Sequence, residues 1–195
     1  PRAYGPGVTA TADVDLVPGA SPTASAVSAP VTASAMRAAL GRFATGVVVI
    51  TAVDDGEPVG FACQSFASVS LDPPLVLFCA DRGGRSWARV RRAGRFTANV
   101  LSAEQRDLCS RFGSRDGRRY DGLAWSMSRW QTPSLPGVLS RVHCEIDDVH
   151  TAGDHHVVIG AVRELETPQD AGPLVYFRGS YDVPGIPGPG ALTRR

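Results

Sequence analysis

The residues best suited to chemistry form one short segment, Asp81-Arg82-Gly83-Gly84-Arg85-Ser86. It combines two glycines, two guanidinium groups and a hydroxyl group, and it precedes a stretch that is expected to be helical. Backbone N–H groups at the start of a helix bind anions, and nearby arginine charge strengthens that preference. The segment therefore predicts an anion site.

The elements that must position this site are two apolar runs, at 59–69 and 75–80, with the residue types of β-strands. Residues 71–74, Leu-Asp-Pro-Pro, separate them. Proline cannot donate a backbone hydrogen bond and it restricts the residue before it, so this tetrapeptide is predicted to be a turn. We expect the two runs and the anion site to form a platform for a flat, phosphate-bearing cofactor.

The N-terminal part of the chain divides into a leader, a helix and a hairpin. Residues 1–34 are rich in Ala, Pro, Ser, Thr and Gly without periodicity, which predicts a flexible leader. Ser34 is expected to cap a short helix over 35–44, followed by a buried strand over 47–53. The turn at 54–56 then predicts an antiparallel hairpin over 47–64.

The C-terminal part is predicted to contain two more helices and several strands. Ser86 is expected to cap a helix over 87–92, and the capping box that joins Ser102 to Gln105 predicts a helix over 103–112. Residues 113–137 predict a long, partly mobile excursion. Further strands are predicted at 96–101, 138–150, 155–165 and 174–177, and the Gly/Pro-rich residues from 184 predict an unstructured tail.

This tally of hairpin-joined strands indicates a mainly β fold, an antiparallel barrel with a few short appended helices. The predicted organisation is a flexible leader over 1–34, one folded domain over 35–183 and a flexible tail over 184–195. No G-x-G-x-x-G follows a predicted strand, which argues against a Rossmann nicotinamide site.

Composition narrows the function classes. The chain has 195 residues with 43% hydrophobic and 20% charged residues, as expected for one globular domain. No apolar run approaches the roughly 20 residues of a membrane span, and no signal-peptide pattern opens the sequence. Its four cysteines lack C-x-x-C spacing, which favours a cytoplasmic protein with reduced thiols. Every basic residue is arginine, so lysine-dependent pyridoxal phosphate chemistry is excluded.

Charge is distributed unevenly along the chain. Residues 82–119 hold eleven arginines against three acids, a local charge of +8, although the whole chain carries only +1. Such a segment attracts small phosphate-bearing anions. Helix faces rich in solvated arginine are the alternative explanation.

Several motifs occur in a fixed order between about residue 36 and 182. They are 43–51, 64–77, Gly94-Arg95-Phe96, Asn99-Val100-Leu101, Ala152-Gly153-Asp154-His155, Gly160-Ala161-Val162 and Tyr176-Phe177-Arg178-Gly179-Ser180-Tyr181. This ordered set resembles the short-chain flavin reductases that serve two-component flavin monooxygenases. The Cys63-Gln64-Ser65-Phe66 variant is most similar to reductase components of aromatic or steroid-ring hydroxylases.

The resemblance implies a split β-barrel of the flavin-reductase type, usually a homodimer with flavin bound near the subunit interface. The implied cofactors are FMN or FAD, with NADH or NADPH as the hydride donor. The implied activity is reduction of flavin, which then passes by diffusion to a separate oxygenase component. Neither nucleic acid nor membrane is an expected partner.

The resemblance also assigns site residues. His155 matches the histidine that lies near flavin and nicotinamide, and Ser86 with Arg85 matches the hydroxyl-bearing phosphate loop. Gly84 departs from the family, in which a serine is common at that position. The remaining predicted cofactor contacts are Thr45, Ala62, Cys63, Gln64, Ser65, Cys79, Ala80, Asp81, Asn99, Phe112, Tyr176, Arg178 and Tyr181.

Three alternatives remain open on the sequence. His155 is also explained as a turn histidine that bonds to the backbone, and no ligand spacing around the four histidines predicts a metal site. The same barrel hosts oxidases of the pyridoxamine-phosphate-oxidase type, which keep their flavin tightly bound. A non-catalytic flavin- or nucleic-acid-binding barrel fits the arginine-rich stretch, but aromatic residues for base stacking are sparse there.

Overall fold

The computed structural model describes residues 30–114 and 117–181. Most of the predicted leader and the whole predicted tail lie outside these residues. The first helix, α1 (Ala33–Leu40), begins inside the predicted leader, and Ser34 therefore lies within the helix instead of capping it. It ends earlier than expected, because Arg42 N donates to Ala39 O (3.1 Å) and Phe43 N donates to Leu40 O (2.9 Å), and these i to i−3 bonds replace the α-helical pattern before β1.

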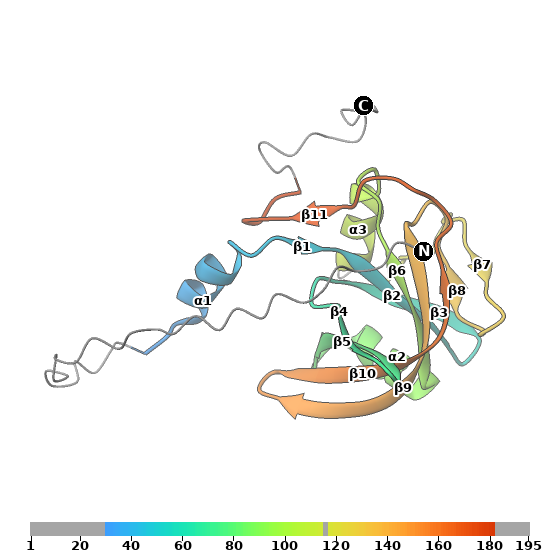
Figure 1. Ribbon diagram of the computed structural model, residues 1–195, viewed down its shortest axis with the longest axis horizontal. Helices are drawn as coiled ribbons and strands as arrows, with labels where there is room; N and C mark the ends of the chain where they lie inside the picture. The colour runs from blue at the N-terminus through green and yellow to red at the C-terminus, as the bar shows by residue number, and fades with distance from the viewer. Residues whose placement is uncertain (1–29, 115–116, 182–195) are drawn as a thin grey trace, which may run out of the picture. The chain divides into compact units, whose positions relative to one another are not determined.

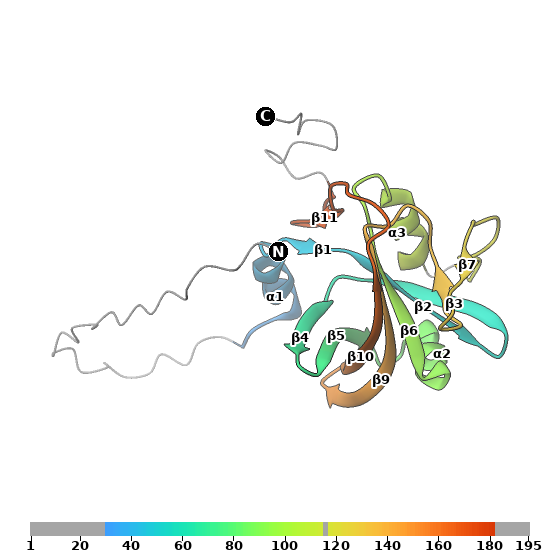
Figure 2. The same cartoon turned by 45° about the vertical axis from the view of Figure 1, so that its right-hand side comes forward.

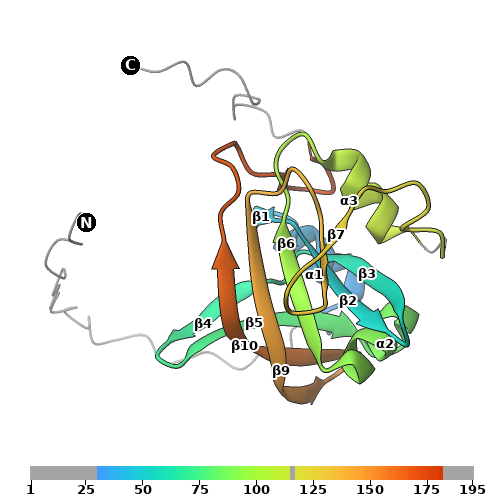
Figure 3. The same ribbon diagram turned by 90° about the vertical axis from the view of Figure 1, so that its right-hand side faces the viewer.

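The predicted mainly β fold is confirmed by a seven-stranded antiparallel sheet with the order β3-β2-β6-β9-β10-β5-β4 (Figures 1 and 3). Among the described residues, the recorded pairings leave β3 and β4 at the two ends of this sheet. The long β9–β10 hairpin curves along one side of it (Figure 2). The strands are β2 (Val48–Asp54), β3 (Glu57–Cys63), β4 (Ala67–Leu71), β5 (Pro74–Asp81), β6 (Arg95–Val100), β9 (Ser140–Ala152) and β10 (His155–Glu166).

The hairpin between β2 and β3 is confirmed, with Asp55 (φ 54°) and Gly56 (φ 78°) at its turn. Positive φ at both central residues matches the right-handed strand twist, which is why this turn type favours Asp-Gly. The expectation of one apolar run over 59–69 was wrong. Residues 64–66 break it, since β3 pairs with β2 whereas β4 pairs with β5 at the other end of the sheet.

Two further helices flank the sheet, and both differ in extent from their predictions. Helix α2 (Arg85–Ala93) starts two residues early and ends at Gly94, which has φ 69° as a left-handed cap requires. Helix α3 (Arg106–Gly113) starts three residues late, because only half of the capping box forms. Ser102 N donates to Gln105 Oε1 (3.0 Å), but the Ser102 hydroxyl donates to Gly137 O (3.0 Å) instead of capping the helix.

Two apolar clusters lie on the two faces of β2. One includes Ile50, Phe78 and Phe96, and the other includes Val49 and Phe112. The second cluster seats α3 against β3, where a Cβ on Gly60 would lie 2.7 Å from Ile50 O and 2.9 Å from Phe112 Cε1. Gly60 is therefore required by close packing.

A buried polar network anchors residues 117–137, which belong to the 113–137 segment that was expected to be partly mobile. Thr97 Oγ1 lies 2.6 Å from Thr132 Oγ1 and 2.8 Å from His143 Nδ1, and all three residues are fully buried. His143 Nε2 in turn lies 2.8 Å from Glu166 Oε1. Hydrogen bonds at both ring nitrogens allow His143 to be buried. The segment's short strands are β7 (Ser126–Met127) and β8 (Pro133–Ser134).

A second small sheet joins the two ends of the described domain. β1 (Thr45–Gly46) pairs with β11 (Val175–Tyr176), which confirms a last short strand in the 174–177 region. Within the described residues, no helix has the length and apolar character needed to cross a membrane.

Candidate functional site

The predicted anion loop is a tight turn between β5 and α2. Gly83 N donates to Asp81 Oδ1 (2.8 Å), and Gly84 N donates to Asp81 O (2.9 Å). A Cβ on Gly84 would lie 3.0 Å from Asp81 O and 3.6 Å from the Cβ of Trp87. The departure from the family at Gly84 therefore has a steric reason, because this turn leaves little room for a side chain.

The loop is joined to the turn between β9 and β10, although the two are far apart in sequence. Arg82 N donates to Asp154 O (3.1 Å), and Arg82 Nη1 donates to Gly153 O (3.1 Å). In the β10–β5 ladder, His155 lies opposite Asp81. The structure thus brings together the anion loop and the Gly-Asp-His turn that the sequence analysis selected separately.

Ser86 lies in the first turn of α2, and its hydroxyl accepts a hydrogen bond from Arg119 Nη1. The same guanidinium donates to Gly60 O on β3 (2.9 Å) and to Ser114 O after α3. Arg119 therefore connects the anion loop, β3 and the end of α3. Sequence reasoning did not single it out, although it closes the arginine-rich stretch that was noted there.

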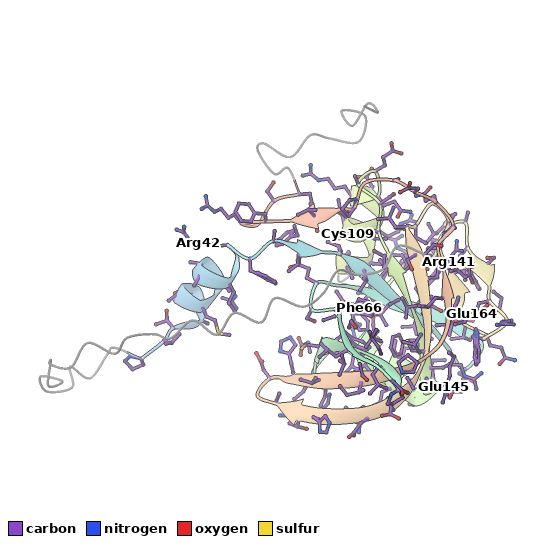
Figure 4. The ribbon with its side chains drawn as sticks, in the orientation of Figure 1. Arg42, Phe66, Cys109, Arg141, Glu145 and Glu164 are labelled. Carbon is purple, nitrogen blue, oxygen red and sulfur yellow. The ribbon has the colours of Figure 1, made fainter. Side chains whose placement is uncertain are left out.

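A cavity of about 360 Å³ lies beside the end of β3. A volume of this size falls within the range of small-molecule sites. Figure 4 labels Cys109, one of the lining residues that α3 contributes, and its Sγ lies 3.0 Å from Tyr181 Oη. The predicted contacts Ala62, Cys63, Gln64 and Tyr181 line this cavity together with Val47, Cys109, Ser110, Gly113 and Ser114.

Ser65 and Cys79 bind each other at the neighbouring strand end. Cys79 N donates to Ser65 Oγ (2.8 Å), and Cys63 Sγ lies 3.2 Å from the same hydroxyl. Burial raises the pKa of the Cys63 thiol above its ordinary value, so it remains protonated at neutral pH. Cys63 thus offers a small, neutral wall to a ligand.

His155 is half exposed and forms a pair with Asp154, whose Oδ1 lies 2.8 Å from His155 Nδ1. The hydrogen bond from His155, together with its charge, lowers the pKa of the Asp154 carboxyl. A carboxylate partner at Nδ1 orients the ring and leaves Nε2 directed to a ligand. The neighbouring His156 differs, since its Nδ1 accepts a hydrogen bond from Trp87 Nε1 (2.8 Å).

Several other predicted contacts have structural partners. Asn99 is fully buried, where it donates to Val49 O (3.2 Å) and accepts from Leu135 N (3.0 Å). Phe112 is buried against Gly60 and Tyr120, and the Ala80 side chain faces the core. We therefore assign direct ligand contact to neither the Asn99 nor the Phe112 side chain, and at Ala80 only the backbone remains available.

The last predicted contacts belong to the segment that follows β11. Tyr176 packs edge-on against Tyr181, at 5.1 Å between ring centroids. Arg178 adopts φ 50°, donates its N–H to Gly41 O (2.8 Å) and stacks on Phe177. Of this group, Tyr181 alone lines the cavity beside β3.

Comparison with known proteins gives the family. The model of the flavin reductase like domain matches residues 40–185. The chain belongs to the flavin reductase family. It is 50% identical to the flavin-dependent monooxygenase reductase subunit HsaB of Rhodococcus jostii over 145 residues, which are 74% of this chain and 74% of that protein. It is 41% identical to the FMN reductase (NADH) SmoA of Agrobacterium fabrum, over 74% of this chain and 82% of that one.

A solved structure supports the same assignment for this flavin reductase. The nitrilotriacetate monooxygenase component B from Mycobacterium thermoresistibile superimposes with a TM-score of 0.73 at 45% identity. The match covers 75% of this chain and 83% of that one. The two chains therefore share a fold over most of their lengths.

The residues of this flavin reductase fit a flavin in both polarity and placement. Thr45 Oγ1 is buried without a hydrogen-bond partner, which a ligand carbonyl or hydroxyl group would supply. The cavity beside β3 is lined by uncharged and mostly small side chains, whereas guanidinium groups gather at the anion loop. In the described part of the chain, no group of three or more His, Cys, Asp or Glu side chains is arranged to hold a metal ion.

Proposed function

We propose that this protein is an NAD(P)H-dependent flavin reductase that reduces FMN or FAD and releases the product to a separate oxygenase component. The observation that carries the proposal is the junction of the anion loop with the Gly153–Asp154 turn, which places His155 opposite Asp81. A site for a flavin phosphate and a site for a nicotinamide are then immediate neighbours. Both relatives described above carry reductase names.

The protein's own residues bind and orient the reactants. Residues 62–65 and the backbone of 79–81 hold the ring edge, and Ser86, Arg85 and Arg119 hold the phosphate. His155 Nε2 hydrogen-bonds the nicotinamide carboxamide and aligns its ring. Bound flavin supplies the redox chemistry, because it accepts two electrons and a proton as hydride from the reduced nicotinamide. Alignment of the two rings is the main requirement for this step, so no catalytic acid is needed.

The working form in this proposal is a homodimer. Phe43 and Leu71 are exposed to 75% and 90% in the single chain, and Met36 and Leu40 of α1 are more than half exposed. Helix α1 buries none of its residues. Exposed apolar side chains of this number are typical of a surface that a second copy covers. Size-exclusion chromatography with light scattering measures this state directly, and a monomer at micromolar concentration would contradict it.

The proposed location is the cytoplasm. All four cysteines are free, and three of them are buried. Reduced, buried thiols fit a reducing compartment, which also supplies NADH and NADPH. The proposed oxygenase partner receives flavin by diffusion, so no stable complex between the two proteins is required.

The decisive experiment is steady-state oxidation of NADH and NADPH with FMN and with FAD, each in turn. We expect loss of nicotinamide absorbance only when flavin is added, and flavin that leaves the protein during dialysis. No flavin-dependent oxidation with any of the four combinations would contradict the proposed function. Flavin that is retained through dialysis, without nicotinamide consumption, would instead favour the oxidase alternative.

A further inference from the structure

A second cavity, of about 340 Å³, lies beyond the end of α3 and is strongly basic. Arg111, Arg118 and Arg119 line it together with Ser114 and Asp121. Among the described lining residues, three guanidinium groups against one carboxylate give a net charge of +2. Guanidinium groups arranged around a concave site favour a phosphate over an uncharged ligand, since they donate paired hydrogen bonds to the phosphate oxygens.

This basic cavity adjoins both parts of the proposed flavin site. Ser114 also lines the cavity beside β3, where the flavin ring is expected to bind. Arg119 lines the basic cavity and donates to the Ser86 hydroxyl of the anion loop. A ligand that places its first phosphate at Ser86 therefore reaches the basic cavity if it continues past that phosphate.

We propose that the basic cavity binds the adenylate end of FAD, with Arg111 and Arg118 as ligands of its second phosphate. FMN ends at the first phosphate, whereas FAD continues through a second phosphate to adenosine. The cavity would therefore favour FAD over FMN. This inference rests on the proposed function and deepens it, because it selects between the two flavins.

The nicotinamide dinucleotide is a less suitable occupant of this cavity. Its contact with the anion loop is expected at Arg82, which binds the Gly153–Asp154 turn next to His155. The basic cavity contacts the opposite end of the loop, where Ser86 binds Arg119. The two dinucleotides thus approach the same loop from its two ends.

The first test replaces both exposed arginines of the cavity, as R111Q/R118Q, in the full chain. We expect the ratio of the Michaelis constants for FAD and FMN to rise about tenfold, as the loss of two charge-assisted hydrogen bonds implies. The matched control is R91Q/R95Q, which removes the same charge from two exposed arginines, one in the last turn of α2 and one at the start of β6. An unchanged FAD to FMN ratio in R111Q/R118Q would overturn the inference.

The second test uses the unmodified protein and therefore does not depend on folding of a variant. Adenosine 5′-phosphate is titrated into assays with FAD and with FMN at fixed NADH. We expect it to compete with FAD and to act several-fold more weakly against FMN. Competition with NADH instead of FAD would assign the cavity to the nicotinamide dinucleotide and overturn the inference.

The two failures are distinguishable. If FMN is reduced by NADH but neither test separates the two flavins, the proposed function stands and the adenylate site does not exist. If neither flavin supports nicotinamide oxidation, the proposed function itself fails. A rise in the Michaelis constant of R111Q/R118Q for NADPH alone would show that these arginines bind a ribose 2′-phosphate, which also contradicts the inference.

Discussion

His155 lies directly across the β10–β5 ladder from Asp81, the residue at which the anion loop begins. This pairing fixes the distance between the two predicted binding elements through backbone hydrogen bonds. Arg82 adds two more bonds across the same junction. The position of His155 relative to the loop is therefore set by the sheet and not by a flexible side chain.

The His155→Ala substitution should slow nicotinamide-dependent flavin reduction about tenfold, because one oriented hydrogen bond to the carboxamide is lost. The effect should appear in kcat or in the Michaelis constant for NADH, with the flavin Michaelis constant little changed. Stopped-flow reduction of bound flavin measures it. His150→Ala is the matched control, since His150 is also exposed and also paired with an aspartate, Asp148 (3.1 Å). Equal flavin-reduction rates in the His155→Ala and His150→Ala variants would indicate that His155 only stabilises the turn.

The Ser86→Ala substitution should raise the flavin Michaelis constant at least tenfold, because hydrogen bonds to charged groups contribute about 1.5–3 kcal/mol. The hydroxyl is lost both to the phosphate and to Arg119, which is then held only by Gly60 O and Ser114 O among the bonds described above. Flavin titration by fluorescence quenching provides an independent value. Ser126→Ala, on an exposed position of β7, should leave the constant unchanged. Wild-type flavin dependence in S86A would remove Ser86 from the site.

The Gly60→Ala substitution should lower the free energy of unfolding by roughly 2–3 kcal/mol, as overpacking in a close-packed core does. The added Cβ would lie 2.7 Å from Ile50 O, a backbone atom that cannot move aside cheaply. Urea denaturation measures the change. The control is Gly172→Ala, because a Cβ there meets no atom within 4 Å. A stability change in G60A no larger than that of G172A would contradict the described packing.

The Asp54→Asn substitution should destabilise the protein at neutral pH and have less effect in acid. Hydrogen bonds from Arg92 and then Arg89 lower the pKa of the Asp54 carboxyl from its ordinary value of 3.8. Because the pKa is lower in the folded state, the stabilisation is complete above pH 3.8 and is lost as the pH falls through the lowered value. Urea denaturation of both proteins as a function of pH measures the difference. Asp147→Asn, at an exposed position of β9, is the control. A difference between wild type and D54N that persists unchanged into acid would contradict this account.

The elements that were predicted correctly are those whose sequence signals lie within the element or in the adjacent turn. The buried strand over 47–53 and the turn at 54–56 predicted the β2–β3 hairpin, and Gly94 correctly ended α2. The sequence analysis also selected the anion loop and the Gly-Asp-His turn as two separate candidates, but no pattern in the sequence shows that these two segments are in contact. That contact depends on the pairing of β5 with β10, which is set by the whole sheet.

The incorrect predictions have a common physical origin. Polar side chains that were expected to have local partners or solvent contact instead form hydrogen bonds with residues that are distant in sequence. Ser102 has the residue type of a helix cap, yet its hydroxyl binds Gly137 O, and α3 starts later as a result. His143 has the residue type of a solvated strand face, yet Thr97 and Glu166 satisfy both ring nitrogens in the interior. The sequence did not distinguish Arg119 from the other ten arginines of residues 82–119, because its hydrogen bond to Ser86 depends on the fold.

The bonds from Arg82 to Gly153 and Asp154 have a consequence for the proposed order of events during turnover. In the proposed site, a nicotinamide that shifted the β9–β10 tip on arrival would also pull on the segment proposed to hold the flavin phosphate. Entry of the electron donor and exit of the reduced product would then be mechanically coupled through one arginine.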